Sequence, residues 1–85
     1  MPVPTTHIVE IQNFVFSPET LSVKADDRIT WVNKDIVPHT TTAADKSWDT
    51  GNLKPKDSDS ITVIKDMTLG YFCRFHPSMK GELDL

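Results

Sequence analysis

Hydrophobic and polar residues alternate in short runs along most of this chain. The clearest run covers residues 28–33, where Ile29 and Trp31 fall on one face of an extended chain. Thr30 and Val32 fall on the opposite face, as in a half-buried β-strand. No segment repeats apolar residues at the i, i+3, i+4 and i+7 spacing of an amphipathic helix. The pattern therefore predicts an all-β protein.

Turn-forming residues divide the chain into about seven short strands. The expected strands cover residues 7–11, 20–24, 28–33, 40–43, 60–65, 71–73 and 81–85. Residues 14–16 are expected to lead into an irregular corner at residues 17–19. The stretch 45–60 is expected to be the least regular part, with Trp48 and Leu53 anchoring it in the core. Several short strands separated by frequent turns favour a β-sandwich.

The length of 85 residues predicts a proline-punctuated arm at residues 1–6 followed by one domain at residues 7–85. A domain of this size has a modest core, so a bound metal would add useful stability. The net charge of −3 supplies no basic surface for nucleic acid, and no apolar run is long enough for membrane insertion. The first residues lack the features of a secretion signal, so work outside the cytoplasm would imply a signal already removed.

Candidate metal chemistry is concentrated in the seven residues from Cys73 to Met79, which hold a thiol, an imidazole and a thioether. Cys73 is the single cysteine, which excludes an intramolecular disulfide. Two histidines, one cysteine thiolate and a weak axial methionine form the copper site used for electron transfer. His76 supplies one imidazole, and His39 is the candidate for the second. We expect Cys73 at a strand end, with His76 and Met79 along a tight loop stiffened by Pro77.

Each of these residues also has an ordinary structural interpretation. Cys73 could be a small buried hydrophobic residue, His39 a surface histidine and Met79 a core filler. All three interpretations would have to hold together, so the combination favours copper. His7 has no soft ligand nearby and is expected to be a solvated residue at the start of a strand.

Five segments carry a resemblance to a known family. They are Phe16–Val23, Ile29–Asn33, Pro38–Thr40, Gly70–Cys73 and His76–Gly81. On these residues the chain resembles the cupredoxins, small blue copper proteins that include the amicyanin, plastocyanin and pseudoazurin groups. The Cys-x-x-His-x-x-Met spacing is more similar to the short ligand loop of amicyanin than to the longer loops of the other two groups.

The resemblance implies a Greek-key β-sandwich with one type 1 copper ion near one end, cycling between Cu(I) and Cu(II). It implies that His39, Cys73, His76 and the axial Met79 hold the metal. The implied function is one-electron transport without substrate turnover, by a monomer in the periplasm or another extracytoplasmic compartment. Redox partner proteins would dock transiently near His76, on an apolar patch that includes Pro38 and Pro77.

Three positions depart from the family pattern. The family often has Asn after the first ligand histidine, where this chain has Thr40, so the link from that loop to the cysteine loop is either a hydroxyl contact or absent. Asp26 and Lys56 stand where turn glycines are usual, which predicts strained or reshaped turns. The interval between His39 and Cys73 is also short for the family.

Other functions are weighed against electron transport. A copper carrier or resistance protein is the main alternative, although such proteins favour Met-rich or paired-thiol sites that this chain lacks. Catalysis by a Cys–His pair would need a cleft and an orienting acid, neither of which the sequence indicates. A multicopper oxidase would need more than the three histidines present. Structural zinc would accept Cys and His, but Met is a poor zinc ligand.

Overall fold

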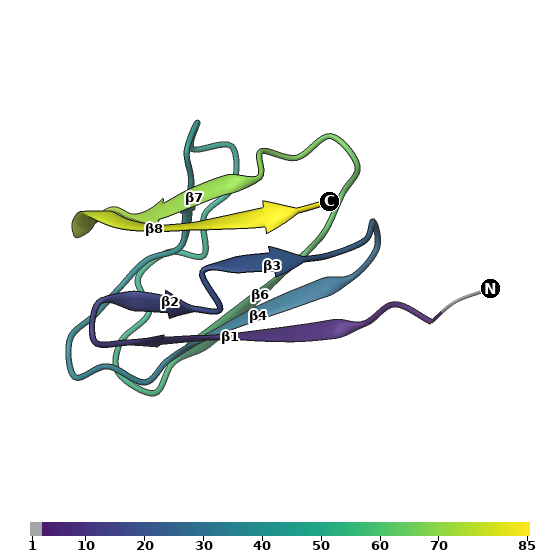
Figure 1. Cartoon of the computed structure of the whole chain (residues 1–85). Helices are drawn as coiled ribbons and strands as arrows, with labels where there is room; N and C mark the ends of the chain where they lie inside the picture. The colour runs from purple at the N-terminus through teal and green to yellow at the C-terminus, as the bar shows by residue number, and fades with distance from the viewer. Residues whose placement is uncertain (1–2) are drawn as a thin grey trace.

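The computed structural model describes residues 3–85, which form two four-stranded sheets packed as a sandwich (Figure 1). The strands are β1 (Thr6–Gln12), β2 (Val15–Ser17), β3 (Thr20–Ser22), β4 (Arg28–Asn33), β5 (Thr42–Ala43), β6 (Ser58–Thr62), β7 (Gly70–Cys73) and β8 (His76–Asp84). One sheet has the order β2-β1-β4-β6 and the other β3-β8-β7-β5. The predicted all-β sandwich is confirmed, with eight strands. Within residues 3–85 no helix is long and apolar enough to cross a membrane.

The first sheet is built on β4, which pairs with β1 in parallel and with β6 in antiparallel orientation. Ile29 and Trp31 are fully buried, whereas Thr30 and Val32 are only partly buried. The alternation predicted for β4 is therefore confirmed. Trp48 stacks on Trp31 with 5.6 Å between ring centroids, and Leu53 is buried, which confirms both anchors. The core draws on both sheets and comprises Val9, Ile11, Phe16, Val23, Ile29, Trp31, Leu53, Val63, Tyr71, Cys73, Met79 and Leu83.

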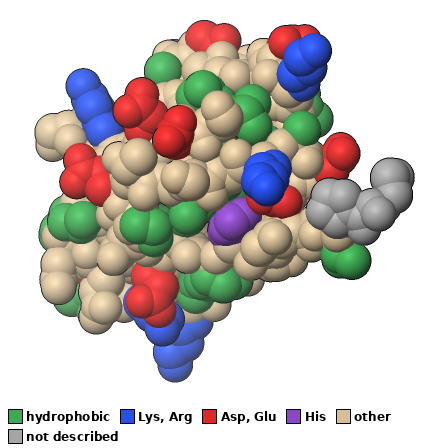
Figure 2. Space-filling view, turned by 45° about the vertical axis from the view of Figure 1, so that its right-hand side comes forward, with side chains coloured by type: hydrophobic (Ala, Val, Ile, Leu, Met, Phe, Trp, Pro, Cys, Tyr) green, Lys and Arg blue, Asp and Glu red, His purple; other side chains and the backbone are tan. Residues whose placement is uncertain are grey.

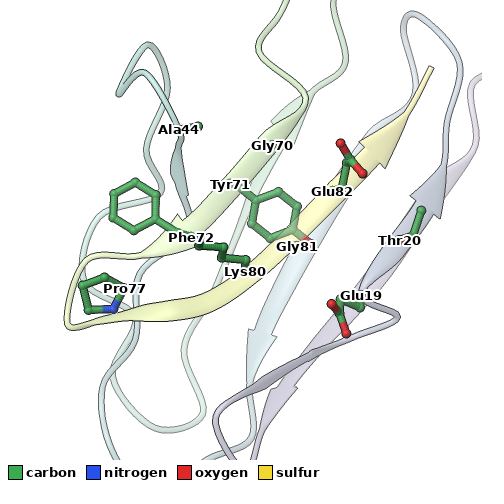
Figure 3. Close-up of a pocket in the computed structure, with 10 residues that line it drawn as sticks. All are labelled: Glu19, Thr20, Ala44, Gly70, Tyr71, Phe72, Pro77, Lys80, Gly81 and Glu82. Atoms are coloured by element: carbon green, nitrogen blue, oxygen red, sulfur yellow. The ribbon is translucent and has the colours of Figure 1, made fainter.

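The second sheet is organised by β8, which lies between β3 and β7. Tyr71 and Cys73 are both buried and share the inner face of β7, as predicted. Tyr71 lies opposite Gly81 on β8, and its ring passes over that glycine (Figure 3). A Cβ atom at Gly81 would lie 2.3 Å from the Tyr71 ring. Glycine is therefore required at this point for the two strands to pair.

One prediction about the strands was wrong at the corner after β1. Residues 15–17 form a strand, β2, that pairs with residues 10–12 of β1. The connection is a two-residue turn in which Asn13 and Phe14 have φ values of 55° and 62°. Positive φ at both central residues is typical of the type I′ turn, whose twist suits a β-hairpin. This turn returns the chain at once to pair with β1, so a strand was missed at residues 15–17, while the corner expected at residues 17–19 is present as the bend at residues 18–19.

The stretch that carries the candidate ligands also differs from its prediction. Only residues 74–75 form the turn, and His76 and Met79 already belong to β8 rather than to a loop. The pairing shifts register between Phe72 and Cys73, so that Cys73 lies opposite His76. The turn itself is therefore tighter than expected. Pairing with Cys73 holds His76, whereas Met79 lies in the unpaired stretch between His76 and Lys80 at the register shift.

Several other strands also begin or end away from the expected residues; β3, for example, ends at Ser22 instead of residue 24. β6 covers residues 58–62 instead of 60–65, because its partner β4 starts at Arg28, opposite Thr62. β5 contains only residues 42–43 of the expected 40–43. The unusual turn residues Asp26 and Lys56 have φ values of 76° and 75°, a region that favours glycine. The prediction that these two turns are strained is thus supported by their backbone geometry.

His7 lies at the start of β1 as predicted, but the prediction that it is solvated was wrong. Its side chain is 19% exposed, and its Nε2–H donates to Asp27 Oδ2 at 2.8 Å. The Asp27 carboxylate also accepts hydrogen bonds from the backbone N–H groups of Thr5 and Lys24. Parallel pairing of β1 with β4 brings the start of β1 beside the turn that precedes β4, which is why the two side chains meet. Residues 1–2 of the predicted arm lie outside the described residues.

Candidate metal centre

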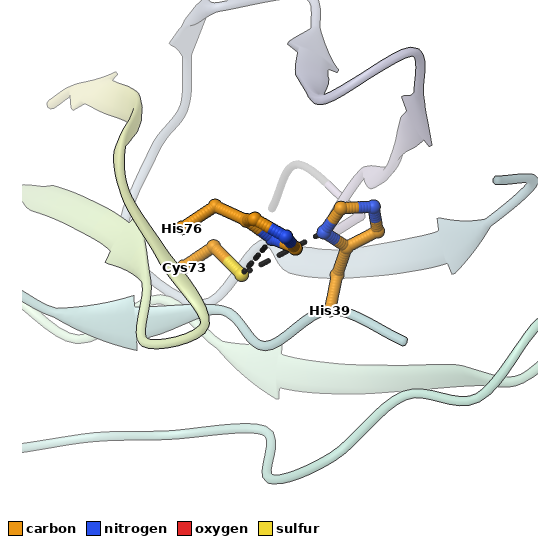
Figure 4. Close-up of side chains that lie close together, drawn as sticks. All are labelled: His39, Cys73 and His76. Carbon is orange, nitrogen blue, oxygen red and sulfur yellow. Dashed lines mark hydrogen bonds between the residues drawn. The ribbon is translucent and has the colours of Figure 1, made fainter. Parts of the chain in front are cut away.

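His39, Cys73 and His76 converge at one end of the sandwich (Figure 4). Cys73 Sγ lies 3.6 Å from His39 Nδ1 and 3.7 Å from His76 Nδ1. Their candidate ligand atoms all lie within 4.8 Å of one another. In Figure 1 the turn between β7 and β8 lies at the left-hand end, away from both termini. Three residues predicted as ligands are therefore brought together by the fold.

The distances from the sulfur to the two nitrogens fit a metal bound between these residues. With bonds of about 2.0–2.3 Å to nitrogen and sulfur, as zinc makes, the donors would be separated by roughly 3.7 Å. The two sulfur–nitrogen distances match this separation. The donor set itself, two imidazoles and one thiolate, is that of an electron-transfer copper site. The residues present thus fit copper by their chemistry and by both sulfur–nitrogen separations.

Met79 is the fourth residue predicted from the sequence. It is 5% exposed and belongs to the same core as Cys73. Its place on β8, three residues after His76, directs it inward in a strand whose alternate residues are exposed. The weak axial role of its thioether remains a prediction.

Asp35 orients the first histidine. His39 is fully buried, and its Nε2–H donates to Asp35 Oδ2 at 2.8 Å, because a carboxylate can only accept. This hydrogen bond is the main reason that the pKa of Asp35 is lowered from its ordinary value. With Nε2 protonated, Nδ1 is left with a lone pair that faces Cys73. A carboxylate behind a ligand histidine is a common way to fix its tautomer and ring orientation.

Thr40 links the histidine segment to the cysteine hairpin. Its backbone N–H donates to Cys73 Sγ at 3.4 Å, and its hydroxyl accepts the backbone N–H of Arg74 at 2.8 Å. The side chain of Arg74 lies 3.0 Å from Asp49 and donates to the Thr42 hydroxyl at 3.3 Å. Of the two alternatives left by the sequence, the hydroxyl contact is the one present.

His76 differs from the other two ligands in exposure. His39 and Cys73 are 0% exposed, whereas His76 is partly exposed. Its ring centroid lies 5.1 Å from that of His39 and 4.7 Å from that of Phe14. Of the three residues it is the one through which the centre can reach the surface.

Two residues at the centre, Asp35 and Phe14, were not singled out from the sequence. Asp35 precedes His39 by four residues, and a carboxylate so close to a candidate ligand is a usable signal. Phe14 lies far from the ligands along the chain, and its only signal is a large apolar residue in a tight turn. Asp35 and Phe14 contact the ligand histidines only in the folded protein, so their roles could not be inferred from local sequence.

Comparisons with known proteins agree with this arrangement. Residues 4–83 match the family model described as "Cupredoxin-like domain". The chain is 26% identical over 81 residues to amicyanin of Paracoccus denitrificans, covering 89% of this chain and 62% of that protein. It therefore spans less than two thirds of that relative.

Solved structures share the fold over nearly the whole chain. A purple cupredoxin from Nitrosopumilus maritimus superposes with a TM-score of 0.84 at 23% identity, covering 92% of this chain and 97% of that one. A reduced amicyanin variant gives a TM-score of 0.81 at 27% identity, covering 93% of this chain and 80% of that one.

Proposed function

The chain belongs to the cupredoxin-like domain family, and on this premise we propose that it is a type 1 copper protein that carries single electrons between redox partner proteins. The observation that carries the proposal is the set of ligand atoms already assembled around Cys73 Sγ. We assign His39, Cys73 and His76 as the strong ligands and Met79 as the weak axial one. Copper bound there would supply a one-electron couple between Cu(I) and Cu(II).

The protein's own contribution is to hold these groups still. Asp35 fixes the His39 ring from behind, and the Thr40 hydroxyl fixes the start of the cysteine hairpin. Cys73 and His76 are paired across two adjacent strands. Ligands that cannot move reduce the rearrangement that accompanies a change of metal charge. Fast electron transfer benefits directly from such rigidity.

We propose His76 as the point where electrons enter and leave, because it is the ligand histidine that is partly exposed. Pro38 and Pro77, expected in the docking patch, are exposed, and the exposed aromatic residues Phe14 and Phe75 are a ring contact and a chain neighbour of His76. Figure 2, in which the end of the molecule opposite the metal centre is turned forward, shows acidic and basic side chains interspersed on that face. A small apolar contact suits brief docking.

The alternatives fit the site less well. Cys73 is 0% exposed, so it is inaccessible to a substrate and unsuited to nucleophilic catalysis. A copper carrier must release its metal readily, whereas two of the three strong ligands here are completely buried. We therefore favour electron transport without substrate turnover. The family resemblance supports the further proposal of a monomer working outside the cytoplasm, which gel filtration and cell fractionation can test.

The proposal is tested by adding Cu(II) to the purified protein and recording its visible spectrum. We expect an intense thiolate-to-copper absorption band that bleaches on reduction, with one electron taken up per protein in voltammetry. Cys73→Ser should remove the band, while His7→Gln, which changes a histidine outside the site, should retain it. Weak copper absorption in the unmodified protein, or an intense band that survives in Cys73→Ser, would contradict the proposal.

A second experiment tests the route of the electron. His76→Ala should exchange electrons with a small redox protein more slowly than the unmodified protein, measured by stopped-flow absorption. The His7→Gln variant serves again as the control. An undiminished rate in His76→Ala would show that electrons leave by another path.

A further inference from the structure

Phe14 occupies a backbone conformation that its side chain does not favour. Its φ of 62° lies in the left-handed region, at the second position of the turn between β1 and β2. Type I′ turns favour Asn followed by Gly at these two positions, and this chain has Asn13 followed by Phe14. A bulky residue held at positive φ stores strain that glycine would relieve. Such strain persists only where the surroundings oppose its release.

The surroundings of the Phe14 ring are the two histidine ligands. Its centroid lies 5.5 Å from that of His39 with the ring planes at 86°, and 4.7 Å from that of His76 with the planes at 82°. Both are edge-to-face contacts, the arrangement that aromatic rings prefer. One side chain thus contacts two ligands that come from segments far apart in the chain.

The backbone of the same residue is attached to the site. The Phe14 N–H donates to Asp35 Oδ2 at 3.2 Å, the oxygen that accepts the His39 Nε2–H at 2.8 Å. The turn and the histidine are therefore fixed by one shared acceptor. Single exposed phenylalanines are common on protein surfaces and need no functional explanation. Phe14 differs from them because it contacts both histidines and keeps a positive φ.

We propose that Phe14 is a positioning residue of the metal centre, which clamps the His39 and His76 imidazoles together and shields their outer side from water. The ring is 49% exposed, so one side faces solvent while its edge or face covers the imidazoles. The strain at the turn is retained because replacing the ring would loosen both ligands. This inference rests on the proposed copper site.

The proposal predicts that one substitution changes metal retention more than stability. Phe14→Gly relieves the strained φ but also removes the ring contacts and raises the entropy of the unfolded chain, so the unfolding temperature of the metal-free protein should change by less than about 4 °C. The same variant should lose copper to a chelator about tenfold faster, because two edge-to-face contacts are gone. Phe14→Tyr keeps the ring and should release copper at the unmodified rate.

A matched control separates relief of strain from loss of the clamp. Asp26→Gly relieves a φ of 76° at a turn that touches none of the ligands, and should raise the unfolding temperature without changing copper release. Unchanged copper release from Phe14→Gly would overturn the proposal. If the unmodified protein forms no coloured copper complex, the proposed function itself fails. If that complex forms but Phe14→Gly releases copper at the unmodified rate, only the proposed role of Phe14 is refuted.

Discussion

Replacing Thr40 by Val tests whether a single hydroxyl joins the histidine segment to the cysteine hairpin. Valine keeps the branched shape of threonine but removes the oxygen. That oxygen accepts the backbone N–H of Arg74 at 2.8 Å and lies 3.1 Å from the Thr42 hydroxyl. Thr40 is fully buried, so water cannot readily take the place of the lost group. The backbone N–H of Thr40, which donates to Cys73 Sγ, is unaffected by the change.

The size of the effect follows from these two hydrogen bonds. A typical hydrogen bond contributes about 0.5–1.5 kcal/mol net, and a buried donor left without a partner costs about 1–3 kcal/mol. The Arg74 N–H is only partly buried, which favours the lower part of this range. We expect Thr40→Val to reduce the free energy of unfolding by about 1–2 kcal/mol. For a chain of this size that lowers the unfolding temperature by roughly 4–16 °C.

The neighbouring residue supplies a matched control. Thr41 is equally buried, but its hydroxyl has no hydrogen-bond partner among residues 3–85. Thr41→Val should therefore be neutral or stabilising. Calorimetry of the metal-free variants measures both changes, and the copper band of Thr40→Val should keep its position because the Cys73 contact survives. Equal stabilities of Thr40→Val and Thr41→Val would refute the reasoning that the Thr40 hydroxyl links the two segments.

Three further predictions concern other parts of the molecule. Asp35→Asn should weaken copper affinity by about 10- to 100-fold in a chelator competition, because the carboxylate orients a ligand histidine; unchanged affinity would exclude that role. The hydrogen bond from His7 lowers the pKa of Asp27 from 3.8 to about 2, so this carboxylate stabilises the fold above pH 3.8 and the benefit is lost between pH 3.8 and about 2. Acid unfolding of Asp27→Asn should lack this dependence, and an identical acid profile would contradict it. Gly81→Ala should lower the free energy of unfolding, measured in urea, by about 1–3 kcal/mol or more, because its Cβ would overlap the Tyr71 ring. Unchanged stability would show that the two strands can move apart at little cost in free energy.

The parts of the fold predicted well are those fixed by local pattern. β4 was placed at its observed bounds because its alternation is regular and both faces are chemically distinct. The three strong ligand candidates were found because Cys, His and Met combine in one short stretch and His39 follows a proline. Neither inference needed knowledge of which strands pair.

The parts that were missed depend on pairing and on contacts between distant segments. β2 has only three residues and owes its existence to its partner β1. The extent of β8 into the ligand stretch depends on a register shift opposite Cys73, which no local pattern encodes. His7 meets Asp27 only because β1 and β4 run in parallel. Asp35 and Phe14 likewise gain their roles from three-dimensional neighbours.

The central position of β8 has a consequence for how the protein is made. This strand follows all the others along the chain, carries His76 and Met79, and must insert between β3 and β7. His39 is 34 residues from Cys73, so the centre cannot assemble from local contacts. During synthesis the first seven strands emerge before the ligand-bearing one is complete. Metal loading is therefore expected to follow the final docking of β8, and a nascent chain that still lacks β8 should offer copper only His39 and Cys73 among the proposed ligands, which lie far apart in sequence.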